Sequence, residues 1–285
     1  MKETTATETA GAPFVGASLV IPVYNQLEYT KQCVESILAR TGAPFELIIV
    51  DNASTDGTRE YLKTLPATVI TNDQNLGCAK AWNQGVRASR GDLIAILNND
   101  IVVTNGWLTG LRRFLEDQGH GIVSPAAREG YLDYDLEAYA RTFTVRCGTA
   151  VRHELYGACL VIARRVFDRI GLFDEAFGYG GCEDVDFHWR ALEAGFRVAI
   201  TGSVLIHHFS KVTQTAIVRT ERRNYSDANL RHFTAKWGRT VRGNWWHRRW
   251  SGLRERATEA YERARYGHTL IERPSRDRPT ETQSR

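Results

Sequence analysis

Apolar runs alternate with amphipathic segments through the first part of the chain. Short runs of aliphatic residues, such as 47–50 and 93–97, are typical of strands buried on both faces. Between and after them, segments 28–40, 78–89 and 107–118 carry apolar residues at helical spacing. Alternation of strands with helices of this length predicts a parallel sheet with right-handed crossovers. We therefore expect an α/β protein whose sheet is flanked by helices.

The next hundred residues continue the pattern less regularly. The apolar spacing predicts strands over 121–125, 156–162 and 198–206 and helices over 164–170 and 185–194, whereas 126–152 shows no clear period. We expect one domain over 15–210, with a Rossmann-like nucleotide-binding half at 15–100 and a second half at 101–210. Residues 1–14 are predicted to be a disordered N-terminus.

Polar side chains follow two of the predicted strands at the point where each strand ends. Asn98-Asn99-Asp100 follows one apolar run, Asp51 follows another, and an acidic segment lies further along at 180–186. The carboxyl ends of strands in open α/β sheets are where ligands bind. A lone Asp after a strand is also an ordinary turn residue. Three acidic segments together predict a divalent cation, a phosphate-bearing ligand and a general base in one cleft.

The chain lacks the two glycine-rich motifs that commonly hold phosphates. No G-x-G-x-x-G follows the first strand, and no G-x-x-x-x-G-K-[ST] occurs anywhere. A metal ion neutralises a diphosphate without a glycine cradle. We therefore expect a cation at Asp100.

Composition excludes several other classes of protein. At 285 residues with 42% hydrophobic content, the chain can bury a sizeable core. No apolar run approaches the roughly twenty residues that span a bilayer, and 1–14 lacks the features of a signal peptide, so we expect a cytoplasmic location. The five cysteines include no C-x-x-C pair, which argues against a disulfide framework or a zinc site.

The C-terminal part is basic and rich in tryptophan. Segment 219–256 holds eleven Lys or Arg against three Asp or Glu. We predict a helical extension over 211–271 and a disordered tail over 272–285. The basic faces are compatible with a solvated surface over an ordinary core, with an acceptor-binding lid, or with peripheral contact to anionic lipid at the inner membrane face. No motif for nucleic-acid binding accompanies them, so we expect no nucleic-acid partner.

Seven motifs occur in the order found in a known family, over roughly 18–210. The chain resembles the inverting nucleotide-sugar glycosyltransferases of family two, which have the GT-A fold, and looks closest to their non-processive, rhamnosyltransferase-like branch. The resemblance implies a Rossmann-like, mostly parallel central sheet flanked by helices, with a C-terminal helical extension. The motifs are 21–25, 50–58, 75–77, 97–100, 171–175, 183–186 and His207.

The resemblance implies a nucleotide pocket on the first half of the sheet. A carboxylate there accepts from an N–H of the base, although Asp51 is also a candidate cap for the turn that follows it. The nucleotide-binding residues expected from the matching motifs are Pro22, Tyr24, Asn25, Asp51, Ser54, Asn75, Lys80, Asn83 and Asn99.

The resemblance also implies a site for Mn²⁺ or Mg²⁺. Asp100 matches the last acid of the family's D-x-D motif, and Asn98 stands where the first acid is usual. An amide oxygen is still a hard ligand, but one charge is lost. His207 resembles the third metal contact, with His208 as the alternative, and one of them is expected to be structural because neighbours on a strand point to opposite faces.

The family's Glu-Asp pair implies the general base, and the resemblance thereby implies that 101–210 is the acceptor and catalytic half. Asp184 is expected to deprotonate the acceptor as it attacks the anomeric carbon, while Glu183 binds sugar or acceptor. Gly180 and Gly181 are expected to allow close approach of the backbone. Asp186 is expected to cap the following helix rather than to react.

We therefore predict a metal-dependent inverting glycosyltransferase that moves one sugar from a UDP, dTDP or GDP sugar to a glycan, peptide or small-molecule acceptor. A sugar-phosphate nucleotidyltransferase would instead show G-x-G-x-R after the first strand, where 22–25 stands. A non-catalytic module that binds sugar nucleotides or a membrane surface would not need Asp184. A processive synthase pairs the fold with membrane spans and Q-x-x-R-W, whereas Trp246 replaces that Gln here.

Overall fold

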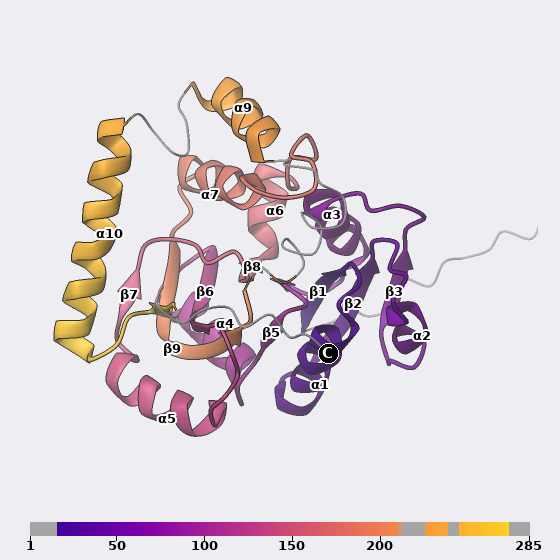
Figure 1. Cartoon of the computed structure of the whole chain (residues 1–285), viewed down its shortest axis with the longest axis horizontal. Coiled ribbons are helices and arrows are strands. Elements are labelled where there is room, and N and C mark those ends of the chain that lie inside the picture. Colours follow the sequence, from indigo (N-terminus) through magenta and orange to yellow (C-terminus); the bar gives the residue numbers. More distant parts are fainter. Residues whose placement is uncertain (1–15, 211, 213–225, 239–244, 274–285) are drawn as a thin grey trace, which may run out of the picture.

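The computed structural model describes residues 16–210, 212, 226–238 and 245–273 (Figure 1). Within these residues the strands form one sheet of ten, in the order β3-β2-β1-β4-β8-β6-β9-β5, with β10 beside β6 and β7 beside β9. The strands are β1 Ala17–Val23, β2 Phe45–Asp51, β3 Thr68–Thr71, β4 Leu93–Leu97, β5 Ile101–Val102, β6 Ile122–Glu129, β7 Val151–Arg152, β8 Cys159–Ala163, β9 Val198–His208 and β10 Ile271–Glu272.

The first half of the sheet is parallel, as predicted. Strands β1 to β4 pair in parallel, and β4 is buried along its whole length because helices cover the sheet. The helices described are α1 Leu27–Arg40, α2 Thr58–Leu62, α3 Cys78–Ala88, α4 Trp107–Asp117, α5 Leu136–Cys147, α6 Arg164–Ile170, α7 Glu183–Glu193, α9 Ser226–Trp237 and α10 Trp245–Tyr266.

The second half of the sheet is mixed. Strand β8 runs antiparallel to both β4 and β6, whereas β6 and β9 are parallel with a register shift between Pro125 and Ala126. The segment 126–152, which shows no clear period in the sequence, does contain regular elements, since β6 continues to Glu129 and α5 follows. Only a narrow stripe of α5 is buried, so its helical period is weak in the sequence. Asp135 caps α5 by accepting a bond from the backbone N–H of Ala138 at 2.9 Å.

The end of β9 determines where the two neighbouring histidines point. The predicted strand stopped at residue 206, but β9 runs through His207 and His208 and pairs with β5 there. Ile101, which directly follows Asp100, lies opposite His208. This pairing brings the polar end of β4 to one of the two histidines.

The C-terminal extension returns to the domain in two places. Helix α9 lies against α7, and α10 runs along the left side of the molecule in Figure 1, near β7, where Arg152 pairs with Glu262 at 2.7 Å. Glu272, the first residue of the predicted tail, is the last residue of β10, which runs parallel to β6. The predicted N-terminal disorder at 1–14 and residues 274–285 lie outside the described residues. No helix among the described residues is both long and apolar enough to cross a bilayer.

Candidate functional site

The polar end of β4 and the acidic start of α7 meet at the loop before β8. The N–H of Asn98 donates to the carbonyl of Ala158 at 2.9 Å. The adjacent Gly157 lies against Asp184, because a Cβ added at Gly157 would be 2.5 Å from Asp184 Oδ2. Two of the three acidic segments predicted to share a cleft therefore lie on either side of residues 157–158.

Asp100 and His208 form the pair that fits a metal ion. His208 Nε2 lies 3.2 Å from Asp100 Oδ1, and both side chains are buried. The N–H of Phe209 donates to the carbonyl of Asp100 at 2.9 Å, which fixes the loop against the end of β9. A carboxylate and an imidazole are ligands that suit Mn²⁺, and carboxylates suit Mg²⁺. In the described part of the chain no three His, Cys, Asp or Glu residues gather as a metal cage, so further ligands would come from Asn98, diphosphate oxygens or water.

Tyr156 and Glu129 orient the ring of His208. The Tyr156 hydroxyl donates to Glu129 Oε1 at 2.9 Å and lies 2.6 Å from His208 Nδ1. Burial, with the charge of Glu129, raises the pKa of Tyr156 well above its ordinary value, so the hydroxyl keeps its proton. Because that proton is given to Glu129, the hydroxyl oxygen accepts from Nδ1–H. In a neutral imidazole this leaves the Nε2 lone pair facing Asp100, which is the arrangement of a metal-binding histidine.

His207 points to the other face of β9. Its Nδ1 lies 3.0 Å from the Tyr134 hydroxyl, and its ring packs edge-on against Phe209. Burial and the neighbouring His208 lower the pKa of His207 to about 4, so it is neutral at physiological pH. The structure therefore reverses the order of preference from the sequence: His208 faces Asp100, and His207 is packed as a structural residue.

Glu183 and Asp184 form a buried acidic pair in the first turn of α7. Glu183 is 5% exposed, and its Oε2 has no hydrogen-bond partner among the described residues. Burial, together with the charge of Asp184, raises the pKa of Glu183 to about 8. Burial also raises the pKa of Asp184, whose Oδ1 accepts from the N–H of Val185 at 2.8 Å. Near neutral pH, Glu183 is therefore protonated beside Asp184, a division of roles typical of acid and base pairs.

The glycine-rich loop 178–181, which precedes the acidic pair in the chain, lies against the start of α3. A Cβ added at Gly77 would lie 2.3 Å from the carbonyl oxygen of Gly178, so the two backbones touch. A Cβ added at Gly180 would lie 3.4 Å from Cys78 Sγ. Within the protein the close approach of two backbones falls at Gly77 and Gly178, and the close approach expected at Gly180 and Gly181 stays a prediction. The contact joins the acidic pair to the nucleotide-binding half of the sheet.

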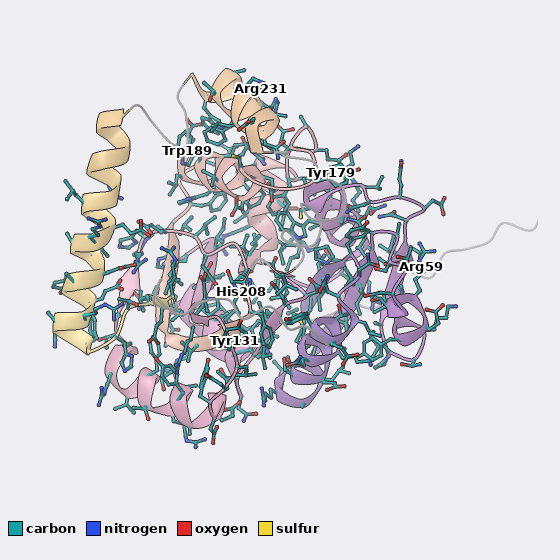
Figure 2. The ribbon with its side chains drawn as sticks, viewed as in Figure 1. Arg59, Tyr131, Tyr179, Trp189, His208 and Arg231 are labelled. Carbon is teal, nitrogen blue, oxygen red and sulfur yellow. The ribbon has the colours of Figure 1, made fainter. Side chains whose placement is uncertain are left out.

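Three of the predicted nucleotide-binding residues gather at the ends of β1 and β2. Asp51 Oδ1 accepts from the N–H of Ser54 at 3.0 Å, so Asp51 does cap the turn, and its Oδ2 accepts from Arg59 at 2.7 Å. The N–H of Asn25 donates to Ser54 Oγ at 2.8 Å. The sequence analysis missed Arg59, which lies in α2 and is labelled at the edge of the molecule in Figure 2. Pro22 and Tyr24 are half-buried at the end of β1.

The other predicted nucleotide-binding residues differ in burial and in the groups to which they bond. Asn75 accepts from the N–H of Gly77 at 3.0 Å, and Lys80 is exposed on α3. Asn83 is 1% exposed and bonds the backbone of Phe173 in both directions, at 2.9 and 3.0 Å. Asn99 donates to Thr30 Oγ1 at 3.0 Å and is buried. The structure therefore brings Asn83 and Asn99 to packing contacts within the protein.

Asp186 joins α7 to α9 and does not cap its helix, which has no side-chain cap bond. Asp186 accepts from Arg190 at 2.8 Å and from the indole N–H of Trp237 at 2.9 Å. The expectation that it does not react is compatible with these bonds, but its predicted capping role is wrong.

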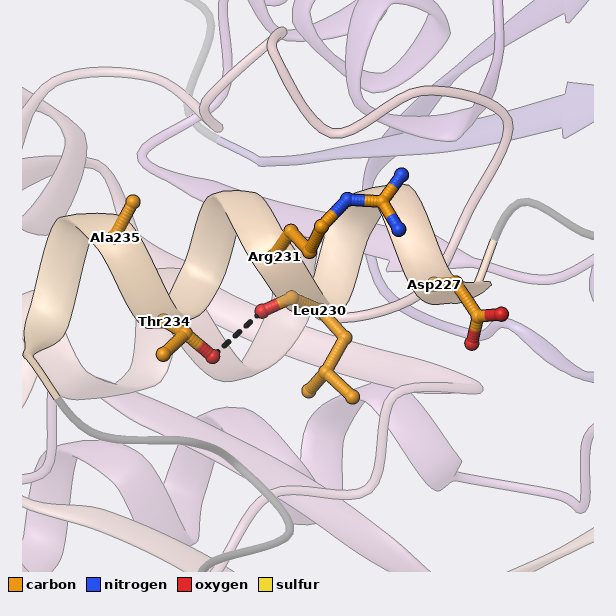
Figure 3. Close-up of a pocket in the computed structure, with 5 residues that line it drawn as sticks. All are labelled: Asp227, Leu230, Arg231, Thr234 and Ala235. Atoms are coloured by element: carbon orange, nitrogen blue, oxygen red, sulfur yellow. Dashed lines mark hydrogen bonds between the residues drawn. The ribbon is translucent and has the colours of Figure 1, made fainter.

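A cavity of about 560 Å³ borders α9 (Figure 3). Its described lining comes from that one helix, and the Thr234 hydroxyl is turned back to the carbonyl of Leu230 at 2.7 Å. None of the predicted site residues lines this cavity. Its described lining residues are Asp227, Leu230, Arg231, Thr234 and Ala235.

Comparison with known proteins agrees with this arrangement. The model of the family "Glycosyl transferase family 2" matches residues 18–171. Glycosyltransferase AglE of Haloferax volcanii is 26% identical over 213 residues, which cover 70% of this chain and 68% of AglE. An uncharacterized protein of Mycobacterium tuberculosis is 30% identical over 213 residues, covering 71% of this chain and 77% of that protein.

Two solved structures share the fold. The structure of GalNAc-T7 with UDP, GalNAc and Mn²⁺ matches with a TM-score of 0.55 at 18% sequence identity. The structure of S. aureus TarS in complex with UDP-GlcNAc matches with a TM-score of 0.54 at 16% sequence identity. The match covers 68% of this chain in both cases but only 43% and 58% of those chains. The predicted GT-A fold is confirmed. The family model matches more than half of the residues of this chain. The chain therefore belongs to glycosyl transferase family 2 and is a glycosyltransferase.

Proposed function

We propose that the protein is a metal-dependent, inverting glycosyltransferase that moves one sugar from a nucleoside-diphosphate sugar to an acceptor nucleophile. The observation that carries the proposal is the placement of two acidic groups around residues 157–158. Asp100 with His208 lies on one side and Asp184 with Glu183 on the other. One group suits a cation on a diphosphate, and the other suits proton transfer from an acceptor.

The ends of β1 and β2 would hold the nucleoside. Asn25, Asp51 and Ser54 form a connected set there, with Arg59 bound to Asp51. UDP, dTDP and GDP sugars are all compatible with this set. The two solved structures that share the fold contain UDP or UDP-GlcNAc, which favours a uridine nucleotide as the first donor to test.

Asp100 and His208 would hold Mn²⁺ or Mg²⁺, with Tyr156 fixing the ring of His208. When bound, the cation supplies positive charge that offsets the diphosphate and stabilises the leaving nucleotide. Because Asn98 replaces an acid, the site has one negative charge less than a two-carboxylate site. We expect the cation to arrive largely with the nucleotide.

Asp184 would act as the general base. The acceptor hydroxyl attacks the anomeric carbon from the face opposite the diphosphate, its proton passes to Asp184, and the bond between the sugar and the diphosphate breaks. This displacement inverts the anomeric configuration. Glu183, holding its proton, would donate a hydrogen bond to the sugar or the acceptor.

Turnover by Asp184→Asn tests the base assignment. The substitution keeps the shape of the side chain and removes its basicity, so we expect a loss of roughly 10²–10⁴-fold in nucleotide release from the donor. Binding of UDP should be unchanged, because the nucleoside is held at the other end of the site. Wild-type turnover by a purified, folded variant would refute the assignment of Asp184 as the base, whereas no turnover by the wild type with any donor would favour a non-catalytic sugar-nucleotide binding module.

A cytoplasmic location and peripheral contact with anionic lipid through 219–256 remain predictions. Part of that range is α9, which is packed on α7, and 219–225 and 239–244 lie outside the described residues.

A further inference from the structure

A side chain of the C-terminal extension holds the loop that precedes the acidic pair. Asn229 lies on α9 and is 3% exposed. Its Oδ1 accepts from the N–H of Gly178 at 3.0 Å, and its Nδ2 donates to the carbonyls of Gly180 and Gly181, both at 3.0 Å. Both N–H donors of the amide and one lone pair of its oxygen are therefore bonded to the backbone of three residues in the segment 178–181.

This loop has little rigidity of its own. Gly180 and Gly181 adopt φ of 154° and 104°, and Cys182 follows with φ of 77°. Glycine loses more conformational freedom on ordering than any other residue, so such a loop is costly to fix. Three hydrogen bonds from one buried amide fix it from outside, directly before Glu183.

Helix α9 is itself anchored on both sides of the loop. Before the loop, Asp174 accepts from Lys236 at 2.7 Å, and beyond it Asp186 accepts from Trp237 at 2.9 Å. One turn earlier on α9, the fully buried Phe233 packs edge-on against Trp189 of α7. Because the helix is anchored at several points, Asn229 is held in a defined position above the loop.

We propose that Asn229 is a positioning residue for the acidic pair. By fixing the backbone of 178–181 it sets where Asp184 lies against Gly157, and therefore where Asp184 lies relative to Asp100 and His208. This inference rests on the proposed function. A misplacement of about 1 Å at a reacting group costs on the order of 10²-fold in rate. Asn229 lies beyond the residues matched by the family model, and the basic extension thereby becomes part of the reaction site.

Asn229→Ala tests the proposal, with Thr234→Ala as the matched control on the same helix. The Thr234 hydroxyl donates to the carbonyl of Leu230 within α9 and does not contact the loop. We expect faster amide hydrogen exchange in 177–184 of Asn229→Ala, with exchange in β1 to β4 unchanged. We also expect kcat for donor turnover to fall by roughly 10–100-fold while the KM for the donor and the Kd for UDP stay the same. Thr234→Ala should match the wild type in hydrogen exchange, kcat, KM and Kd.

A second variant covers the case in which Asn229→Ala fails to fold. Asn229→Asp keeps the acceptor for Gly178 and removes the donor to Gly180 and Gly181, so faster exchange should be confined to the second part of the loop and kcat should again fall. Exchange that equals the wild type in the folded variants, or an unchanged kcat, would overturn the proposal. If the wild type turns over no donor, the proposed function fails, whereas the exchange measurements still decide whether Asn229 fixes the loop.

Discussion

The proton on Glu183 makes the stability of the protein depend on pH in a defined direction. Burial raises the pKa of Glu183 from 4.5 to about 8. Between these two values the native state holds a proton that the unfolded chain has released. The free energy of unfolding must therefore fall as pH rises through this window, because stability rises with pH only where the unfolded state binds more protons. Glu183→Gln removes the titration while keeping a neutral side chain of the same shape.

The size of the effect follows from the two pKa values. One proton of difference between the native and unfolded states gives a slope of about 1.4 kcal/mol per pH unit. Within this window the wild type should therefore lose stability relative to the variant as pH rises, because only the wild type gives up a proton on unfolding. Glu183 is 5% exposed, so solvent screens the effect little. The neighbouring Asp184 titrates together with it and broadens the transition.

Urea unfolding at several pH values between 5.5 and 7.5 measures this slope. The wild type should lose stability faster than Glu183→Gln as pH rises, by about 1.4 kcal/mol per pH unit. Asp117→Asn, a change at an exposed carboxylate on α4, is the control and should keep the wild-type slope. Equal slopes in the wild type and Glu183→Gln would show that Glu183 titrates normally, and the assignment of the proton to Glu183 would be wrong.

The metal site yields the remaining predictions. His208→Ala should abolish Mn²⁺ binding in the presence of UDP, as measured by electron paramagnetic resonance. His207→Ala should retain Mn²⁺ binding and lose only stability. The opposite pattern would make His207 the metal ligand. Tyr156→Phe leaves Nδ1 of His208 without its partner, so we expect Mn²⁺ affinity to weaken by roughly 10-fold or more. Tyr134→Phe, the same change on the His207 side, should leave the affinity unaltered, and equal losses in both variants would contradict the role given to Tyr156.

The sequence predicted those parts of the fold that depend on local periodicity. Strands β1, β2 and β4 and helices α1 and α3 have clear apolar patterns, and the polar residues after β4 fall where a sheet edge binds ligands. Helix α5 was missed because its narrow buried stripe gives little signal, although Asp135 at its start is a recognisable cap. The antiparallel direction of β8 follows from tertiary packing that periodicity does not report.

The site residues that the sequence missed act over long separations. Tyr156 contacts His208, and Asn229 contacts the glycine loop, each across about fifty residues of chain. No spacing rule connects positions so far apart. The choice between His207 and His208 depended on where β9 ends and on its register with β5, and a shift of one residue exchanges the two faces of a strand.

The central claim is that Asp100 and His208 hold a cation on the diphosphate of a sugar nucleotide. The most direct test is nucleotide release from a panel of UDP, dTDP and GDP sugars, measured with Mn²⁺ present and again after chelation with EDTA and confirmation that no metal remains. The account predicts release from at least one donor with Mn²⁺, loss of that release with EDTA, and its return when Mn²⁺ is added back. Full turnover by metal-free protein would contradict the account.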